Sequence, residues 1–296
     1  GTATLSSDIQ VGDLVVRSGA TLIIEGKLNI SGDIVNEGQI IFESTSIQTA
    51  VLESVPSNSR IVGNGFEVRR YIPDSNRAFR YLSSSTTTTN SSLPSINDNW
   101  QEGVNNTSTA DVSNLNPNPG FGTHITGSIT GANGLDATLT GNASLFEWEE
   151  SLQNWEAITN TTTQEFIAGN AYTILIRGDR GTTLNSNTAL GDPTVLRITG
   201  ELQFGEFNVE ASNLSPSDNP NGNFNLVGNP YQSQVDLKEL LDNHSTGINN
   251  NIAYIFDPTI GTRGGYATID LDNPSNPSVP SGTLANQYLQ PNQAFF

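Results

Sequence analysis

The carboxylates whose spacing best suits catalysis lie around two tryptophans near the middle of the chain. The cluster consists of Glu147, Glu149, Glu150 and Glu156 with Trp148 and Trp155. A glycosidase places two carboxylates on opposite sides of a sugar, between aromatic walls. Glu147 and Glu149 also flank Trp148 in strict alternation, which is the pattern of a half-exposed strand. The alternation favours a structural β-hairpin over a glycosidase site.

Aromatic side chains elsewhere offer a binding site without catalysis. A tryptophan or tyrosine ring combines an apolar face with a polar edge, which suits a sugar when the ring is exposed. The candidates for carbohydrate binding are Trp100, Trp148, Trp155 and Tyr231. Packing in a core would explain the same residues, and the sequence leaves both interpretations open.

Two oxygen-rich turns are candidates for calcium. Their ligands would be Asp218, Asn221, Asn223, Asp270 and Asp272. Calcium takes six to eight oxygens from such loops, but neither turn has the closing glutamate of an EF-hand. Asp and Asn also form tight turns without any ion. We therefore expect no cofactor and keep calcium as the alternative.

Histidine and cysteine chemistry is sparse. The chain has two histidines, His124 and His244, and no cysteine. These numbers disfavour a metal site built mainly from histidine and exclude a thiolate nucleophile within the chain. No Gly-x-Ser-x-Gly elbow is present to expose a nucleophilic serine. We predict that the chain is not an enzyme.

Six of the 12 basic residues fall into short strings in the second part of the sequence. They are Arg69, Arg70, Arg77, Arg80, Arg177 and Arg180. In so acidic a chain we expect them to form ion pairs within the second region or where two regions join, with Asp74 and Asp179 as partners. A pocket for an acidic sugar is the alternative.

Charge and composition limit the class of protein. The 296 residues carry a formal net charge of −18, which argues against nucleic acid and anionic lipid as partners. No apolar stretch approaches the roughly 20 residues of a membrane-spanning helix, so we expect no membrane insertion. The chain has no methionine. We therefore expect a mature form or a fragment, from which a signal peptide has been removed.

Residues 1–66 show a repeating pattern. Short apolar triplets such as Leu14–Val16 and Leu22–Ile24 recur every six to seven residues and are separated by glycines. A triplet can form one short strand, and stacked coils give each strand neighbours above and below. The pattern favours a β-solenoid, with irregular hairpins of a sandwich as the alternative.

Residues 67–296 contain longer apolar runs separated by turn signals such as Asn118-Pro119-Gly120. This spacing predicts a β-sandwich or jelly roll. One short helix is predicted at Leu237–Asn243, capped by Asp236 with Glu239 three residues later. The segments 83–99 and 270–283 are predicted to be long polar loops, and the Ser/Thr/Asn run 83–92 to be flexible.

The second region contains several distinctive strings, which include RAFRYL at 77–82, GFGTHITG at 120–127, LVGNPYQS at 226–233 and QPNQAFF at 290–296. In these strings it resembles a β-rich domain of large proteins that Bacteroidota export by the type IX secretion system, and the first region resembles the segment that precedes that domain. The resemblance implies export across the outer membrane and a place on the cell surface or in the medium. It implies no catalytic residues.

The sequence therefore predicts an all-β chain: a β-solenoid over 1–66 and a β-sandwich over 67–296 with one short helix. The favoured function is a non-enzymatic, secreted or cell-surface structural or adhesive module, such as a fibre subunit that assembles through strands at 1–7 and 293–296. A carbohydrate-binding module is the alternative, and a glycoside hydrolase is the second alternative. Expected partners are further copies of the chain, or a glycan or protein on a surface.

Overall fold

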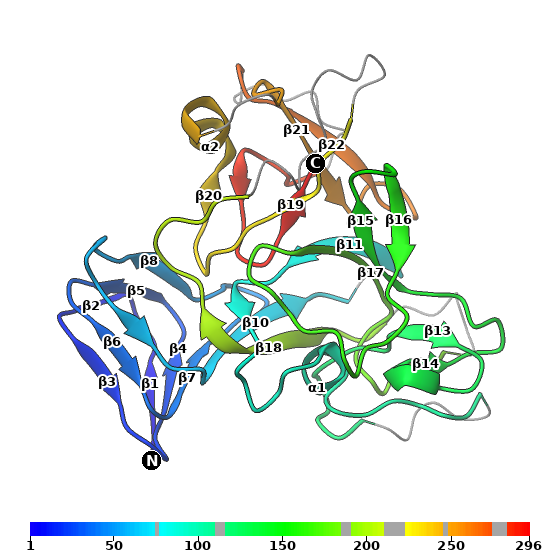
Figure 1. Cartoon of the computed structure of the whole chain (residues 1–296), viewed down its shortest axis with the longest axis horizontal. Helices are drawn as coiled ribbons and strands as arrows, with labels where there is room; N and C mark the ends of the chain where they lie inside the picture. The colour runs from blue at the N-terminus through cyan, green and yellow to red at the C-terminus, as the bar shows by residue number, and fades with distance from the viewer. Residues whose placement is uncertain (75–76, 110–115, 185–190, 210–222, 245–247, 274–282) are drawn as a thin grey trace.

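The computed structural model describes residues 1–74, 77–109, 116–184, 191–209, 223–244, 248–273 and 283–296 (Figure 1). Strand accounts for 39% of the structure and helix for 6%, which confirms the all-β class. No helix among these residues is long and apolar enough to span a bilayer.

The first nine strands form three parallel rows that stack coil upon coil (Figure 1). The rows are β1 (Thr2–Leu5), β4 (Thr21–Ile24) and β7 (Gln39–Phe42); β2 (Ile9–Val11), β5 (Lys27–Ile30) and β8 (Val51–Ser54); and β3 (Leu14–Val16), β6 (Ile34–Asn36) and β9 (Ile61–Val62). Each apolar triplet thus supplies one strand, and Ile24, Leu28 and Ile34 point into a fully buried interior. The corners require small residues: a Cβ at Gly38 would lie 2.3 Å from the carbonyl oxygen of Ala20.

Strand β10 (Phe66–Ile72) belongs to both parts of the chain. It pairs in parallel with β7 of the stack and antiparallel with β18 (Thr194–Leu202). The resulting six-stranded sheet has the order β1-β4-β7-β10-β18-β12, where β12 is Thr86–Thr87. The sheet therefore runs without a break through the position where we predicted a domain boundary, and the division into two domains stays a prediction.

A four-stranded antiparallel sheet shares a core with β10 and β18. Its order is β11 (Ala78–Ser83), β17 (Ala171–Ile176), β15 (Leu145–Glu149) and β16 (Asn154–Ala157). Apolar residues of both sheets form one buried cluster, as in a sandwich. Trp100 fills this core, with its ring centroid 4.7 Å from that of Phe166 and 5.7 Å from that of Tyr172. Beside it lie β13 (Thr126–Ser128), the 3-10 turn η1 (Ala132–Gly134) and β14 (Asp136–Ala137).

The C-terminal part has a smaller core of its own. It contains β19 (Val227–Gly228), β20 (Val235–Asp236), α2 (Leu237–His244), β21 (Ile252–Asp257), β22 (Gly265–Asp270), β23 (Tyr288–Leu289) and β24 (Ala294–Phe295). The predicted helix is confirmed as α2, and the Asp236 carboxylate caps it by accepting from the Lys238 backbone N–H at 2.9 Å. A second helix, α1 (Ile96–Trp100), was not predicted, although Ser95 and Asp98 form its capping box.

The first half of the serine and threonine run is buried, so the prediction of a flexible segment was wrong for residues 83–88, whereas Thr89, Asn90 and Ser92 are exposed. Ser83, Ser84, Ser85 and Thr86 are all 0% exposed. Their small side chains allow backbones to approach closely, since a Cβ at Gly228 would lie 2.6 Å from the Cβ of Ser83. The hydroxyls find partners inside the protein, which satisfies the polar groups that burial would otherwise leave unpaired. The second predicted loop, 270–283, lies mostly outside the described residues.

The segment 293–296 is paired within the chain. Strand β24 pairs with β19, and Phe296 exchanges two backbone hydrogen bonds of 2.7 and 2.9 Å with Tyr254. Gln293 also forms a bridge to Leu82. The backbone groups that we expected to join another copy are therefore already used. At the other end of the sheet, β1 pairs with β4 and is exposed.

Replacing Ile34 by alanine should destabilise the stack by about 2–5 kcal/mol, because a fully buried side chain is lost from a closed interior. Urea unfolding followed by circular dichroism measures the loss. The matched control is Val15→Ala in the same row of strands, where the side chain is 51% exposed. Equal effects of the two substitutions would contradict the assignment of the interior.

Candidate functional site

A groove with a volume of about 430 Å³ lies where the stack meets the C-terminal part. The residues around it come from β8 and its continuation, from the segment after β18, and from the segment that leads into α2. They are residues 52–55, 203–205 and 231–236, with Glu239 and Leu240. Segments that are distant in sequence therefore form one concave surface, which is the usual setting of a ligand site.

The segment that carries Tyr231 is held from beneath by Asn229. The buried Asn229 side chain accepts from the Tyr231 backbone N–H at 2.9 Å and donates to the Ser233 and Gln290 carbonyls. The Tyr231 hydroxyl donates to the Gly205 carbonyl at 2.8 Å, which fixes the ring at the groove. Gln232 attaches the segment to the stack by donating to the Ala50 carbonyl at 2.8 Å. The aromatic group of the groove is therefore preorganised.

The lining of the groove is acidic. Its charged side chains are Glu53, Asp236 and Glu239, and none of the described lysines, arginines or histidines lines it. Glu53 lies 2.6 Å from the Lys27 ammonium. This hydrogen bond, with a second one from Asn29, lowers the pKa of Glu53. Asp236 is engaged as the cap of α2 and accepts from the Gln287 side chain. The groove thus combines fixed carboxylates, amides and the rings of Tyr231 and Phe204.

Of the four residues predicted to bind carbohydrate, only Tyr231 lines the groove. Trp100 is 2% exposed and packs in the main core, which leaves no face of its ring for a sugar. Trp148 and Trp155 lie opposite each other on the β15–β16 hairpin with ring centroids 5.1 Å apart. Both pack against Phe296, at 5.0 and 5.8 Å. These two rings join the hairpin to the C-terminal part.

The glutamates around the two tryptophans lie on a hairpin, as the alternation indicated. Glu147 and Glu156 are directly paired across β15 and β16. Burial raises the pKa of Glu147, which accepts from the Gln164 side chain. Glu149 accepts from the hydroxyl and the backbone N–H of Ser151 and so closes the turn. The groove contains none of these residues.

The candidate calcium ligands are only partly covered by the structure. Asp218 and Asn221 lie outside the described residues, and Asn223 borders them. Asp270 accepts from the backbone N–H groups of Asp272 and Asn273, and Asp272 pairs with Lys238 at 3.1 Å. Within the described ranges, no group of three or more His, Asp or Glu side chains is arranged to hold a metal ion.

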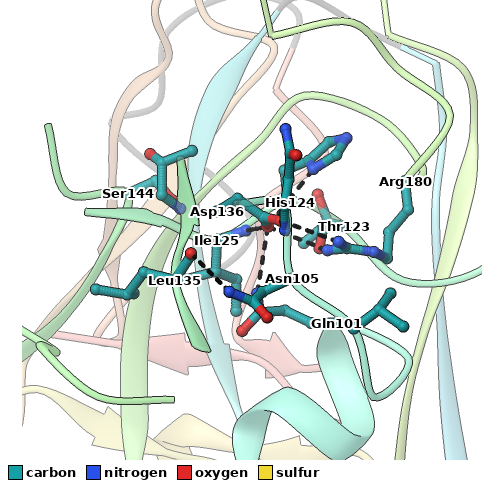
Figure 2. A network of polar contacts seen from close by, with 12 residues as sticks. Gln101, Asn105, Thr123, His124, Ile125, Leu135, Asp136, Ser144 and Arg180 are labelled. Atoms are coloured by element: carbon teal, nitrogen blue, oxygen red, sulfur yellow. Dashed lines mark hydrogen bonds and ion pairs between the residues drawn. The ribbon is translucent and has the colours of Figure 1, made fainter. Parts of the chain in front are cut away.

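A fully buried carboxylate, Asp136, collects hydrogen bonds from several segments (Figure 2). The Arg180 guanidinium donates to both of its oxygens, at 3.1 and 2.9 Å. The backbone N–H of Asn106 donates at 2.7 Å and that of Ile125 at 2.9 Å. Gln101, at the end of α1, adds a side-chain donor at 3.2 Å. The sequence did not indicate Asp136. Among the residues around this carboxylate, Arg180 was considered as a partner in an ion pair.

Histidine 124 lies next to this carboxylate, with its Nδ1 atom 3.5 Å from Asp136. Burial alone raises the pKa of Asp136, but contact with His124 and the charge and hydrogen bonds of Arg180 reverse the effect and lower it to about 2. All three side chains are 0% exposed. A substrate cannot reach them from the surface, so we assign this network to the fold and not to catalysis.

Of the six arginines that we expected to form ion pairs, Arg69 does so where the two parts of the chain join, in a ladder of alternating charges. The ladder consists of Glu43, Arg69, Glu67, Arg197 and Glu102. Arg69 and Arg197 lie directly opposite each other on β10 and β18. Like charges at such a position repel, and the intervening Glu67 offsets the repulsion. The ring of Phe121 covers both guanidiniums, at 5.3 and 4.8 Å.

The predicted acidic partners of the arginines were wrong. Asp179 stabilises turns by accepting from the Asn116 side chain and from the backbone N–H groups of Gly120 and Gly181. Asp74 is exposed, and the ion pairs between described residues do not include it. The partner of Arg180 is Asp136, which precedes it by a long stretch of chain.

No family model, no curated protein and no solved structure matches this chain. The resemblance to the domain of type IX-secreted proteins therefore stays a prediction.

The stability of the protein should fall as pH drops from about 4 towards 2, because Asp136 has a lowered pKa in the folded state and an ordinary value near 3.8 in the unfolded state. The unfolded state then binds more protons, and protonation removes about 2 kcal/mol that is fully present above pH 4. Urea midpoints between pH 2 and pH 6 measure this slope. Asp136→Asn should flatten it and should also lower stability at pH 6, since it leaves Arg180 buried beside a neutral group. If the urea midpoint of this variant depends on pH as steeply as that of the unchanged protein, the acid sensitivity comes from other carboxylates.

Replacing Phe296 by alanine should lower the free energy of unfolding by about 2–3 kcal/mol, because its ring packs against both tryptophans of the β15–β16 hairpin. The tryptophan emission should also shift to the red as Trp148 and Trp155 gain solvent. Phe224→Ala is a matched control: Phe224 contacts Phe296 but is itself 47% exposed. A smaller effect of Phe296→Ala than of Phe224→Ala would contradict the joining role of Phe296.

Proposed function

We propose that this chain is a non-enzymatic adhesive module of the cell surface that binds a carbohydrate without a negative charge. The groove at the junction of the stack and the C-terminal part carries this proposal. It brings the fixed ring of Tyr231 together with the side-chain amides of two glutamines, Gln203 and Gln234. An aromatic face with neighbouring amides and carboxylates suits the apolar face and the hydroxyl groups of a sugar ring.

The charge of the groove supports a neutral or amine-bearing sugar over an acidic one. Three carboxylates line the groove, of which Glu53 is paired with Lys27, and no cationic side chain of the described residues lines it. A uronic acid, sulfate or sialic acid would place a second negative charge among them, and like charges at short range are unfavourable. Sugar hydroxyls, in contrast, can donate hydrogen bonds to carboxylates that are already ionised.

The state of these carboxylates favours binding over hydrolysis. A glycosidase requires one carboxyl group whose pKa is raised so that it can act as an acid. The hydrogen bonds from Lys27 and Asn29 lower the pKa of Glu53. Asp236 is committed to the backbone of α2 and to Gln287. The other glutamates considered for hydrolysis lie on the β15–β16 hairpin, away from the groove lining.

The pairing of the C-terminal segment argues against a fibre that assembles through 293–296, whereas β1 is an exposed edge strand of its sheet. The segment 293–296 lies between β19 and Tyr254, and its backbone is paired there. Its deletion would remove part of the folded structure, so loss of assembly after that deletion would not identify an assembly strand. Export and surface location belong to the proposal and rest on the sequence strings that resemble type IX-secreted proteins.

Tyr231→Ala should weaken carbohydrate binding at least tenfold, because it removes the main aromatic face of the groove. The first measurement is a screen of the whole chain against an array of neutral, amine-bearing and acidic glycans. Calorimetry with the oligosaccharides that bind then compares the variant with the unchanged protein. We expect binding to neutral or amine-bearing glycans and weak or no binding to acidic ones.

Tyr288→Ala serves as the control, since this tyrosine is 47% exposed but does not line the groove. Its affinity should match that of the unchanged protein. The proposal fails if no glycan on the array binds, or if the two tyrosine variants lose affinity equally.

A further inference from the structure

Several arginines gather where β10, β11 and β17 meet, on a part of the molecule separate from the groove. They are Arg70 on β10, Arg77 and Arg80 at the start of and within β11, and Arg177 directly after β17. The pairing of Ala78 with Ile176 makes Arg77 and Arg177 neighbours at the ends of adjacent strands. Like charges at adjacent strand positions repel, so this arrangement needs a compensating negative charge.

No carboxylate in the described part of the chain forms an ion pair with the Arg177 guanidinium. Its Nη1 atom is buried and makes no hydrogen bond. Burial lowers the pKa of Arg177, nearby Arg77 lowers it further and Asp136 partly opposes both, which gives a value of about 10. The side chain is therefore still cationic at neutral pH, and a buried cation is costly unless an anion is close.

Arg177 and Arg80 line the same small cavity between the two sheets. Its other residues are Ile72, Pro73, Ile176, Gly178, Gly191 and Asp192. The volume open to a water-sized probe is about 10 Å³. Asp192 is exposed, and the lining carries two guanidiniums against this one carboxylate. The surroundings are therefore cationic in a protein whose net charge is −18.

We propose that this cavity binds a single halide ion, chloride in the native setting, held by the Nη1 group of Arg177 and by the positive charge of Arg80. The size of the cavity selects the anion. Space for about one water-sized sphere admits a monatomic ion but not phosphate, sulfate or the acidic sugar that the sequence left as an alternative. The bound ion would balance the charge between β10 and the β11–β17 pair and so stabilise the contact between the two sheets.

The location of the ion can be tested directly by crystallising the whole chain in sodium bromide and collecting anomalous data at the bromine edge. We expect a bromide peak in the cavity, within hydrogen-bond distance of Arg177. The second measurement compares melting temperatures in sodium chloride and sodium gluconate at equal ionic strength. Chloride should raise the melting temperature by about 2–4 °C, because it binds the folded state.

Arg177→Gln should abolish the difference between the two salts, while Arg60→Gln, a change at an exposed arginine, should preserve it. If Arg177→Gln does not fold, the bromide peak and the salt comparison on the unchanged protein still decide the matter. A peak without any chloride-specific stabilisation indicates an adventitious ion only and overturns the proposal. The absence of a peak in the cavity overturns it as well.

Discussion

The pairing of Asp136 with Arg180 is the interaction on which the arrangement of α1, β13 and β14, at the lower right of Figure 1, depends. One carboxylate, fully buried, ties the end of α1, the segment before β13 and the turn after β17 to β14. In the unfolded chain, water would accept hydrogen bonds from these donors. The hydrogen bonds to Asp136 therefore add little net stability, and their main effect is to fix the relative positions of the segments. Removing either charge would leave the other stranded in the interior.

Local patterns were sufficient to predict the strands and α2. The apolar triplets of residues 1–66 each became a strand, and Asp236 caps the helix as its position suggested. The Ser/Thr run failed because composition describes side-chain polarity and not location. Small hydroxyl groups suit a flexible linker, but they equally suit a place where Gly228 brings another backbone within contact distance. Neighbours from distant segments determine which of the two applies, and the local sequence does not reveal them.

The candidate site was harder to predict than the fold for the same reason. The groove combines residues near 53, 204, 231 and 239, and nothing in the sequence around Tyr231 distinguishes it from Trp100, which is buried. Arg69 and Arg180 were recognised as partners in ion pairs, yet their acidic partners were not, because Glu43 and Asp136 approach them only through the folding of intervening segments. Residue type thus indicates that a charge needs compensation, and topology decides which group supplies it.

The two neighbours of β10 can pair with it at different times during folding. On one edge lies β7, from the preceding coil, and the stack before it pairs each strand with the next coil. On the other edge lies β18, and the whole stretch between Ile72 and Thr194 must be arranged before these strands meet. Closing a long loop costs more entropy and takes longer than closing a short one. The stack can therefore form early in synthesis. Its last strand, β10, then offers an unpaired edge with which β18 pairs later.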